Sequence, residues 1–284
     1  MRESRPEIAT VWEPTREGRT RKQENVEAPV STKETMDQKK ERVAAMHPEE
    51  RTIEDLGLQI NKDKYVKEDI SELTQVIQDN VDLFAMSNSE LPACKWLKAV
   101  FKLKDPNAKP VRGRVFQHSM EAKKEIEKQI NQLLKDGFIE RSCSPFTSSN
   151  MLVKKKDGSL RMVQDNRPIN KLLQEEIYAP NTLAEIVERV GSENPTIYSS
   201  VDLRSAYQQI EIEEGPSRDY SAFTCHLGVF QFRRMSFGMS STPAKFMMLI
   251  SMVIGTDPML QRNCMPYIDD LLLYSKNLEK HTNC

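Results

Sequence analysis

The chain has 284 residues, a formal net charge of −1 and a hydrophobic content of 38%. The near-neutral charge excludes bulk attraction to a polyanion as an argument for nucleic-acid binding, and the low apolar content predicts that part of the chain is not folded. The five cysteines form no C-x-x-C pair, and the sequence has no signal-like N-terminus and no apolar run of about 18 residues. These features favour a reduced, intracellular protein that does not span a membrane.

Charge is unevenly distributed along the chain. Residues 102–171 hold 16 Lys and Arg against 8 Asp and Glu, whereas residues 172–214 hold 2 against 9. A basic half beside an acidic half fits a protein that holds a polyanion with one and a metal ion with the other. Two solvated faces of opposite sign explain the same pattern, so charge alone leaves both interpretations open.

The N-terminal part is predicted to contain little packed structure. Residues 1–60 are rich in Glu, Lys, Arg, Thr and Pro, and they are interpreted as a disordered, charged extension with one helical stretch near 38–45. Residues 61–118 form a connecting segment, in which apolar residues at helical spacing predict a helix over roughly 64–80.

Residues 119–284 are predicted to form the main domain. A helix is expected after Ser119 and ends at Gly137, and strands at 150–155 and 160–164 are joined through Asp157-Gly158, a typical hairpin pair. The capping box Thr182-Leu183-Ala184-Glu185 opens a helix that ends near Gly191. The remaining expected elements are strands at 196–201, 207–213, 220–225 and 229–234, a helix from Thr242-Pro243 with Gly255 beyond its end, and a final hairpin. Strands and helices do not alternate regularly, which favours an α+β fold with an antiparallel sheet.

Two adjacent acids occur in Tyr267-Ile268-Asp269-Asp270. The apolar flanks predict strands, so the acids are expected at or beside a tight turn. Adjacent carboxylates repel each other and are costly to bury unless a divalent cation binds them. Asp202 ends another predicted strand, and if the two strands are neighbours, three carboxylates converge. Such a site suits two magnesium ions and in-line phosphoryl chemistry, although an Asp-Asp pair alone is more often an exposed turn.

Six segments form an ordered series of motifs, at residues 140–146, 153–162, 165–171, 200–210, 237–244 and 267–270. The series resembles the reverse transcriptase domain of gypsy-type LTR retrotransposon Pol polyproteins, over about residues 81–281. Several motifs in the right order are far more specific than any one of them. The resemblance implies a right-hand polymerase with fingers and palm, the palm being an antiparallel sheet backed by helices.

The resemblance also implies the role of each site residue. The catalytic residues would be Asp202, Asp269 and Asp270, which with the Leu203 carbonyl would hold two Mg²⁺ ions, or Mn²⁺ in their place. The incoming dNTP would be bound by Lys155, Arg161, Tyr207, Phe237 and Gly238, and nucleic acid would be bound by Lys154, Lys156, Arg167 and Tyr267.

Two of these roles have ordinary structural alternatives. The Tyr207 ring would lie beside the incoming sugar and exclude a 2′-hydroxyl, but an ordinary core tyrosine is an equal alternative from sequence alone. The lysine run 154–156 is, without the family, a solvated basic turn. Asn166 departs from the family pattern, in which an aromatic residue precedes Arg167, and Ser236 stands where a proline is usual.

The expected function is therefore an RNA-directed DNA polymerase fragment of a retrotransposon, using a template, a primer and dNTPs. The sequence ends before the thumb that the family carries, and the RNase H and integrase domains of a full-length polyprotein are expected but absent from it. One alternative is a catalytically inactive remnant that only binds nucleic acid. Another is a different magnesium enzyme, such as a nucleotide cyclase or an RNA-templated RNA polymerase. The expected location is the cytoplasm, or virus-like particles within it.

Overall fold

The computed structural model describes residues 36–56, 58, 66–155, 158–178 and 181–282. Contacts divide the chain into two units, one extending to Ser87 and including Leu278–Asn283, the other formed by Asn88–Asn277. The predicted domain boundaries after residues 60 and 118 stay predictions.

The first unit is helical in the part of it that the structure describes. It contains α1 (Met36–Ala45), η1 (Pro48–Glu50), α2 (Ile53–Leu56), α3 (Lys67–Asp79), η2 (Val81–Leu83) and α10 (Leu278–Thr282). The helices expected near 38–45 and 64–80 are confirmed by α1 and α3. Arg51 is 1% exposed, and its guanidinium donates to the main-chain oxygens of Val43, Met46 and Phe84, each at 3.2 Å. These bonds compensate the burial of its charge and tie together three segments of the unit.

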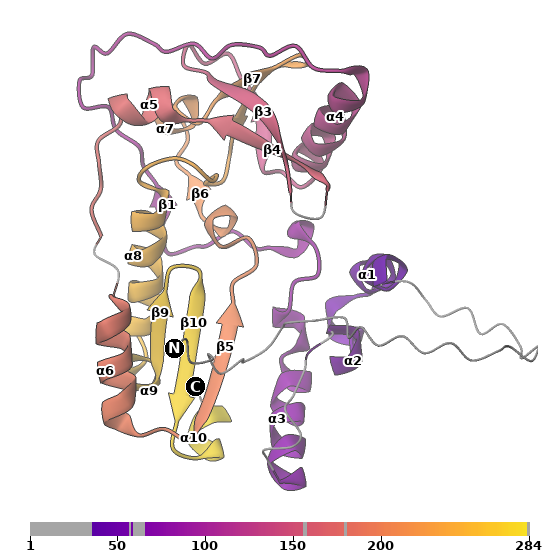
Figure 1. The fold of residues 1–284 in the computed structure, drawn as a ribbon, viewed down its shortest axis with the longest axis vertical. Coiled ribbons are helices and arrows are strands. Elements are labelled where there is room, and N and C mark those ends of the chain that lie inside the picture. Colours follow the sequence, from indigo (N-terminus) through magenta and orange to yellow (C-terminus); the bar gives the residue numbers. More distant parts are fainter. Residues whose placement is uncertain (1–35, 57, 59–65, 156–157, 179–180, 283–284) are drawn as a thin grey trace, which may run out of the picture. The chain divides into compact units, whose positions relative to one another are not determined.

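The second unit contains the antiparallel sheet expected for a palm (Figure 1). Its strands are β5 (Ile197–Asp202), β10 (Asp270–Ser275) and β9 (Cys264–Tyr267), in the order β5-β10-β9. The helices α6 (Leu183–Glu193), α8 (Thr242–Gly255) and α9 (Pro258–Asn263) accompany this sheet. Ile186 and Val190 of α6 pack on Met265 and Tyr274 of the two hairpin strands. The α+β class predicted from the order of elements is confirmed.

A second, five-stranded sheet has the order β2-β8-β7-β3-β4. Its strands are β2 (Ile139–Arg141), β8 (Gly228–Phe232), β7 (Phe223–Cys225), β3 (Ser148–Lys154) and β4 (Leu160–Asp165). All neighbours are antiparallel except β3 and β7, which are parallel. The β3–β4 hairpin confirms the two strands expected around Asp157-Gly158, although residues 156 and 157 lie outside the described residues.

The helix α4 (Met120–Lys135) packs on β2 and β4 of the five-stranded sheet. The Ser119 hydroxyl accepts a hydrogen bond from the Ala122 amide at 3.2 Å, and Gly137 follows the helix with φ +70°. A side chain at Gly137 would be strained in this left-handed conformation, so the predicted start and end of the helix are both confirmed.

The expected strand at 207–213 is wrong over its first half. Ser205 has φ +47°, and it is followed by the 3₁₀ turn η4 (Ala206–Gln209) and the two-residue strand β6 (Glu211–Ile212), which pairs in parallel with β1 (Lys98–Ala99). Tyr207 and Ile210 are both buried and lie three residues apart. A 3₁₀ turn places residues at this spacing on the same side, whereas a strand would place them on opposite faces.

Other differences are smaller. Gly255 is the last residue of α8 and not a residue beyond it, and the strand expected at 220–225 is shortened to β7 by the preceding helix α7 (Pro216–Asp219). The sequence also gave no expectation of η3 (Asn88–Glu90), of α5 (Arg167–Leu172) or of α9, whose first turn is capped by the Asp257 carboxylate.

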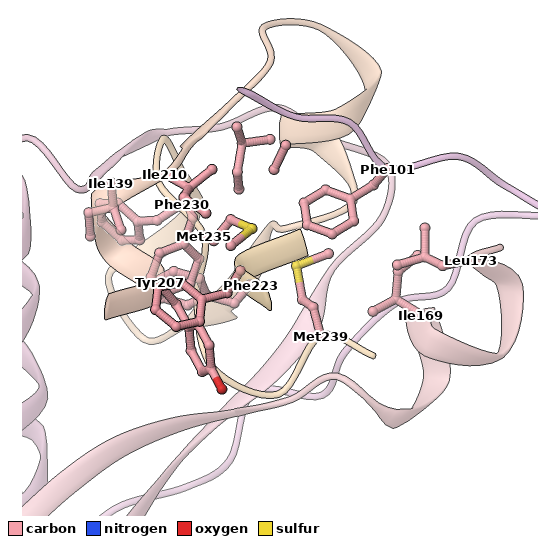
Figure 2. Packing of buried hydrophobic residues seen from close by; sticks show 14 of the residues in the cluster. Phe101, Ile139, Ile169, Leu173, Tyr207, Ile210, Phe223, Phe230, Met235 and Met239 are labelled. Atoms are coloured by element: carbon pink, nitrogen blue, oxygen red, sulfur yellow. The ribbon is translucent and has the colours of Figure 1, made fainter. Parts of the chain in front are cut away.

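The main core of the second unit surrounds the aromatic rings of β7 and β8 (Figure 2). Tyr207 belongs to this core and is 8% exposed, and its ring meets those of Phe237 and Phe246 edge-on, with centroids 5.1 and 5.4 Å away. Figure 2 shows its hydroxyl pointing away from the other buried side chains. Across the described part of the chain, no helix combines the length and apolar character that a bilayer crossing needs.

The capping box of α6 gives a first testable expectation. The Thr182 hydroxyl accepts from the Glu185 amide at 3.2 Å, and the Glu185 carboxylate accepts from the Thr182 amide at 2.7 Å. Thr182→Ala removes one half of the box and should lower the free energy of unfolding by about 1 kcal/mol. Urea titration followed by circular dichroism would measure this. Thr256→Ala, near the C-terminus of α8, is the control, and an equal loss in both variants would contradict a specific capping effect.

Candidate active site

The β9–β10 hairpin presents Asp269 on a two-residue turn. Tyr267 and Asp270 are cross-strand partners, so Ile268 and Asp269 form the turn itself. Ile268 has φ +57°, a conformation that two-residue hairpin turns require but that a β-branched residue adopts only under strain. Strain of this kind persists where surrounding structure enforces it, and it is concentrated at functional sites.

The three predicted acids lie at one end of the three-stranded sheet. Asp202, the last residue of β5, is the cross-strand partner of Asp270, the first residue of β10. The Leu203 amide reaches the Asp269 carbonyl oxygen at 3.5 Å. Directly opposed residues in an antiparallel pair have Cβ atoms about 5 Å apart, so β5 and the turn bring the acids together although they are far apart in the sequence.

The carboxylate of Asp269 has one oxygen without a partner. Its Oδ1 atom is buried and accepts no hydrogen bond. The carboxylate faces Tyr207, whose pKa is raised to about 12 by burial, by the charge of Asp269 and by its hydrogen bond to Asp269. A buried, unpaired carboxylate oxygen is costly in free energy, and a bound cation would remove that cost.

These residues fit a magnesium ion by their chemistry. Aspartate and main-chain oxygens are the hard donors that Mg²⁺ prefers. Within the described ranges, no three His, Cys, Asp or Glu side chains are grouped closely enough to hold a metal ion by themselves, and Asp202 and Asp270 are exposed. This agrees with how Mg²⁺ is usually held, by one or two carboxylates together with water and substrate phosphates, and not by an all-protein cage.

A chain of contacts connects the β3–β4 hairpin to the β9–β10 turn. The Arg161 guanidinium carbon lies 4.7 Å from the centre of the Phe237 ring, in a cation–π contact. Phe237 is 43% exposed and meets the Tyr207 ring, whose hydroxyl interacts with Asp269. Arg161, Phe237 and Tyr207, which are all expected to bind the nucleotide, therefore form a continuous series of contacts. The series ends at Asp269, the expected catalytic acid.

The turn that carries Phe237 and Gly238 is held by two asparagines that the sequence did not indicate. Asn166 donates to the Phe237 carbonyl at 3.3 Å, and Asn170 donates to the Gly238 carbonyl at 2.8 Å and accepts from the Ser240 amide at 3.0 Å. Gly238 has φ +90°, where any side chain would be strained. In the sequence, Asn166 stood out only because the family usually has an aromatic residue at this position. Its hydrogen bond to the Phe237 carbonyl gives the amide a structural role here.

The β3–β4 hairpin and α4 border an open, shallow pocket of about 370 Å³. It is lined by Glu125, Gln129, Lys155, Ser159, Leu160 and Arg161. Lys155 and Arg161 thus face one space, as two cations that bind one triphosphate would. Lys154 is exposed at the end of β3, and Lys156 lies outside the described residues.

Arg167 and Tyr267, both expected to bind nucleic acid, are engaged within the unit. The Arg167 guanidinium makes a bidentate pair with Asp165, with both bonds at 2.7 Å, and this lowers the pKa of the Asp165 carboxyl group. The Arg167 side chain is nevertheless 82% exposed. Tyr267 is half-buried against the small core formed with α6.

A small apolar pocket of about 80 Å³ lies beside the β9–β10 turn. It is lined by Tyr178, Tyr207, Pro243, Ala244, Phe246, Met247 and Ile268. Tyr207 therefore belongs to the core and also lines a pocket that Ile268 of the turn borders.

An antiparallel sheet with one acid on its hairpin turn and two strand-terminal aspartates in register, together with a second sheet that carries a basic hairpin, fits the palm and fingers of a nucleic-acid polymerase. Residues 153–284 match the family described as reverse transcriptase (RNA-dependent DNA polymerase). This part of the chain is a reverse transcriptase domain of that family, whose members generally use divalent metal ions.

The curated relatives are transposon polyproteins. The Tf2-3 and Tf2-7 polyproteins of Schizosaccharomyces pombe are 33% and 32% identical over 228 residues, which is 78% of this chain. The chain spans 16% of the length of each, so it corresponds to one part of these polyproteins.

Solved structures with the same fold are foamy virus protease–reverse transcriptases. One from prototype foamy virus has a TM-score of 0.67 at 19% identity, covering 87% of this chain and 30% of that chain. Another, in complex with double-stranded DNA, has a TM-score of 0.65 at 19% identity, covering 90% of this chain and 41% of that chain. A third, in complex with an RNA/DNA hybrid, has a TM-score of 0.58 at 19% identity and covers 91% of this chain and 32% of that chain.

Proposed function

We propose that the chain is the fingers and palm of an RNA-directed DNA polymerase from a retrotransposon polyprotein, which adds dNTPs to a primer 3′-hydroxyl on an RNA or DNA template. The observation that carries this proposal is the Asp269 carboxylate. It lies on a strained turn, with a buried unpaired oxygen, at the end of the sheet where Asp202 and Asp270 are paired in register.

The proposed ligands for two Mg²⁺ ions, or for Mn²⁺, are the carboxylates of Asp202, Asp269 and Asp270 and the carbonyl of Leu203. When bound, the metal makes the primer hydroxyl a better nucleophile and neutralises charge on the triphosphate and the leaving pyrophosphate. The aspartates supply the negative charge that holds the cations, and the strained turn fixes the position of Asp269 before substrate binds.

The remaining site residues bind and orient the nucleotide in this proposal. Lys155 and Arg161 contact the triphosphate, whose departing oxygens gain charge during the reaction. Phe237 and Gly238 form the surface beneath the nucleotide, where the absence of a side chain at Gly238 lets the main chain come close. Tyr207, with its ring packed on Phe237 and Phe246, excludes a 2′-hydroxyl by its position.

Template and primer are the proposed macromolecular partners. Lys154, Lys156, Arg167 and Tyr267 would contact their backbones, since phosphate contacts dominate affinity for nucleic acid. The foamy virus enzymes of the same fold were solved with double-stranded DNA and with an RNA/DNA hybrid, which supports this choice of partner. RNase H and integrase domains are proposed for the longer polyprotein, because the curated relatives are polyproteins of which this chain spans only a part.

We propose a reducing compartment, the cytoplasm or virus-like particles within it, as the location. Within the described part of the chain, Cys94, Cys143 and Cys225 are free thiols. Fractionation of cells that express the complete element would test this, and recovery of the protein from the secreted fraction would contradict it.

Magnesium-dependent primer extension tests the function. The chain should extend oligo(dT) on poly(rA) with dTTP in the presence of Mg²⁺, and EDTA should abolish the product. Asp202→Asn is the matched control, because it removes one charge and keeps the size of the side chain. Equal product from the wild type and Asp202→Asn would contradict the proposal. Binding of the duplex by both proteins without any extension would favour the inactive remnant.

A further inference from the structure

Gln129 of α4 bonds the main chain of β4 on both sides of Arg161. Its Nε2 atom donates to the Leu160 carbonyl at 2.8 Å, and its Oε1 atom accepts from the Met162 amide at 2.9 Å. β4 is the edge strand of the five-stranded sheet, with β3 as its partner on the other side. A primary amide offers a donor and an acceptor just as a strand residue does, so Gln129 acts as a one-residue strand partner opposite Arg161.

The orientation of the Gln129 amide is fixed by Glu125, one turn earlier on α4. Nε2 also donates to the Glu125 carboxylate at 2.6 Å. The Leu160 carbonyl and the Glu125 carboxylate can only accept, and the Met162 amide can only donate. The reverse orientation would set the Gln129 oxygen against two acceptors and would leave the Met162 amide without this bond, so the network permits one orientation only.

The consequence falls on Arg161. Two hydrogen bonds that flank a single residue fix its main-chain conformation, and hence the direction in which its side chain leaves the strand. At its far end the Arg161 guanidinium lies over Phe237. Gln129 and Arg161 also line the same open pocket of about 370 Å³ together with Lys155. A side chain held at both ends loses less freedom when it binds a ligand, and this favours affinity.

We propose that Gln129 is a positioning residue for Arg161, and that through Arg161 it sets the affinity of the fingers for the triphosphate of the incoming dNTP. The inference rests on the proposed polymerase function, because it assumes that Arg161 binds the triphosphate. Glu125 serves the same purpose one step further away, by orienting the Gln129 amide.

Gln129→Ala and Gln129→Glu test this inference in the full chain. The glutamate variant keeps the size and still accepts from Met162, but it cannot donate to Leu160. We expect both variants to raise the KM and the Kd for dTTP about tenfold, with kcat and the affinity for poly(rA)/oligo(dT) changed less than about twofold. Gln132→Ala is the matched control, because Gln132 lies on the same helix and makes an equivalent bond to Asp136 that touches no strand.

A double-mutant cycle separates positioning from general stabilisation. If Gln129 acts through Arg161, Gln129→Ala should change the Kd for dTTP by less than about twofold in an Arg161→Ala background. Full additivity of the two substitutions, or a fall in kcat with an unchanged Kd, would overturn the inference. The Kd is measured by calorimetry and needs no turnover. If the wild type binds dTTP in a Gln129-dependent way but does not extend primers, only the polymerase function is refuted. If the wild type neither binds dTTP nor extends primers, both the polymerase function and the positioning role of Gln129 are refuted.

Discussion

Asp269→Asn should abolish magnesium-dependent primer extension, with a loss of at least about a thousandfold in kcat. The substitution keeps the size of the side chain and removes the negative charge from the turn. An amide is a poorer ligand for Mg²⁺ than an ionised carboxylate, and Asp202 and Asp270 already serve as ligands of their own in the proposed site. Single-turnover extension of a labelled primer would measure the loss without interference from product release.

The same variant should not be less stable than the wild type in EDTA. The wild-type Asp269 carries a buried, unpaired carboxylate oxygen, so neutralising it removes a desolvation cost. Magnesium at ten times its Kd should stabilise the wild type by about 1.4 kcal/mol in the free energy of unfolding, and it should therefore raise the melting temperature. The melting temperature of Asp269→Asn should stay almost unchanged. Scanning calorimetry with and without Mg²⁺ would measure both effects.

A control distinguishes loss of a ligand from loss of an aspartate. Asp82→Asn changes an exposed acid of η2 and should leave extension and the magnesium response unaltered. Two results would contradict the metal role of Asp269: extension by Asp269→Asn within tenfold of the wild type, or an undiminished magnesium shift in its melting temperature.

The catalytic end of the sheet was predictable because its information is local. Apolar runs on both sides of Asp269-Asp270 indicate two strands, and only a tight turn can join strands that are so close in the sequence. The pairing of this hairpin with the strand that ends at Asp202 was predictable for a chemical reason. Three carboxylates can lie close together when a cation binds them, so the strand that carries the third acid was expected beside the hairpin. The register of Asp202 opposite Asp270 agrees with that expectation.

The supports of the site were not predictable, because they depend on contacts between residues far apart in the chain. Nothing in the sequence singles out Gln129, and only the position of α4 beside the edge of β4 gives its amide two main-chain partners. Asn166 and Asn170 hold the turn at Phe237 and Gly238 from about seventy residues away. A side-chain amide carries no periodic signal, so the sequence cannot indicate which main-chain group it will bind.

The misread segment after Asp202 shows a different limit. A strand was expected at 207–213, but a single left-handed residue, Ser205, leads into a 3₁₀ turn that buries Tyr207. Glycine adopts a positive φ readily, but serine does so rarely, so a serine in the sequence does not predict a left-handed conformation. The sequence left open whether Tyr207 is a core residue or a wall of the nucleotide site, and the structure places it in the core and also in the lining of the small pocket beside Ile268.

Tyr207→Ala should therefore have two large effects at once. Removing the ring leaves a cavity between Phe237 and Phe246 and should lower the free energy of unfolding by about 3–5 kcal/mol. It should also weaken the rejection of ribonucleotides, so that the ratio of kcat/KM for dTTP over UTP falls by about 10- to 100-fold, the range in which a pocket wall rejects an added hydroxyl. Denaturant titration and competitive primer extension measure the two effects separately.

Two further variants show whether the ring itself, and not general loosening, excludes the 2′-hydroxyl. Tyr207→Phe keeps the ring and removes only the hydroxyl that faces Asp269, so it should preserve the dTTP-over-UTP ratio within about threefold. Tyr220→Ala removes a different half-buried aromatic, one that meets Phe146 edge-on at 5.1 Å, and it should lower stability without changing the ratio. If Tyr220→Ala relaxes sugar selection as much as Tyr207→Ala does, discrimination follows from overall rigidity and the wall at Tyr207 is not its source. If only Tyr207→Ala relaxes it, the ring that completes the core is also the surface that selects the sugar, because the 3₁₀ turn after Asp202 places one side chain in both environments.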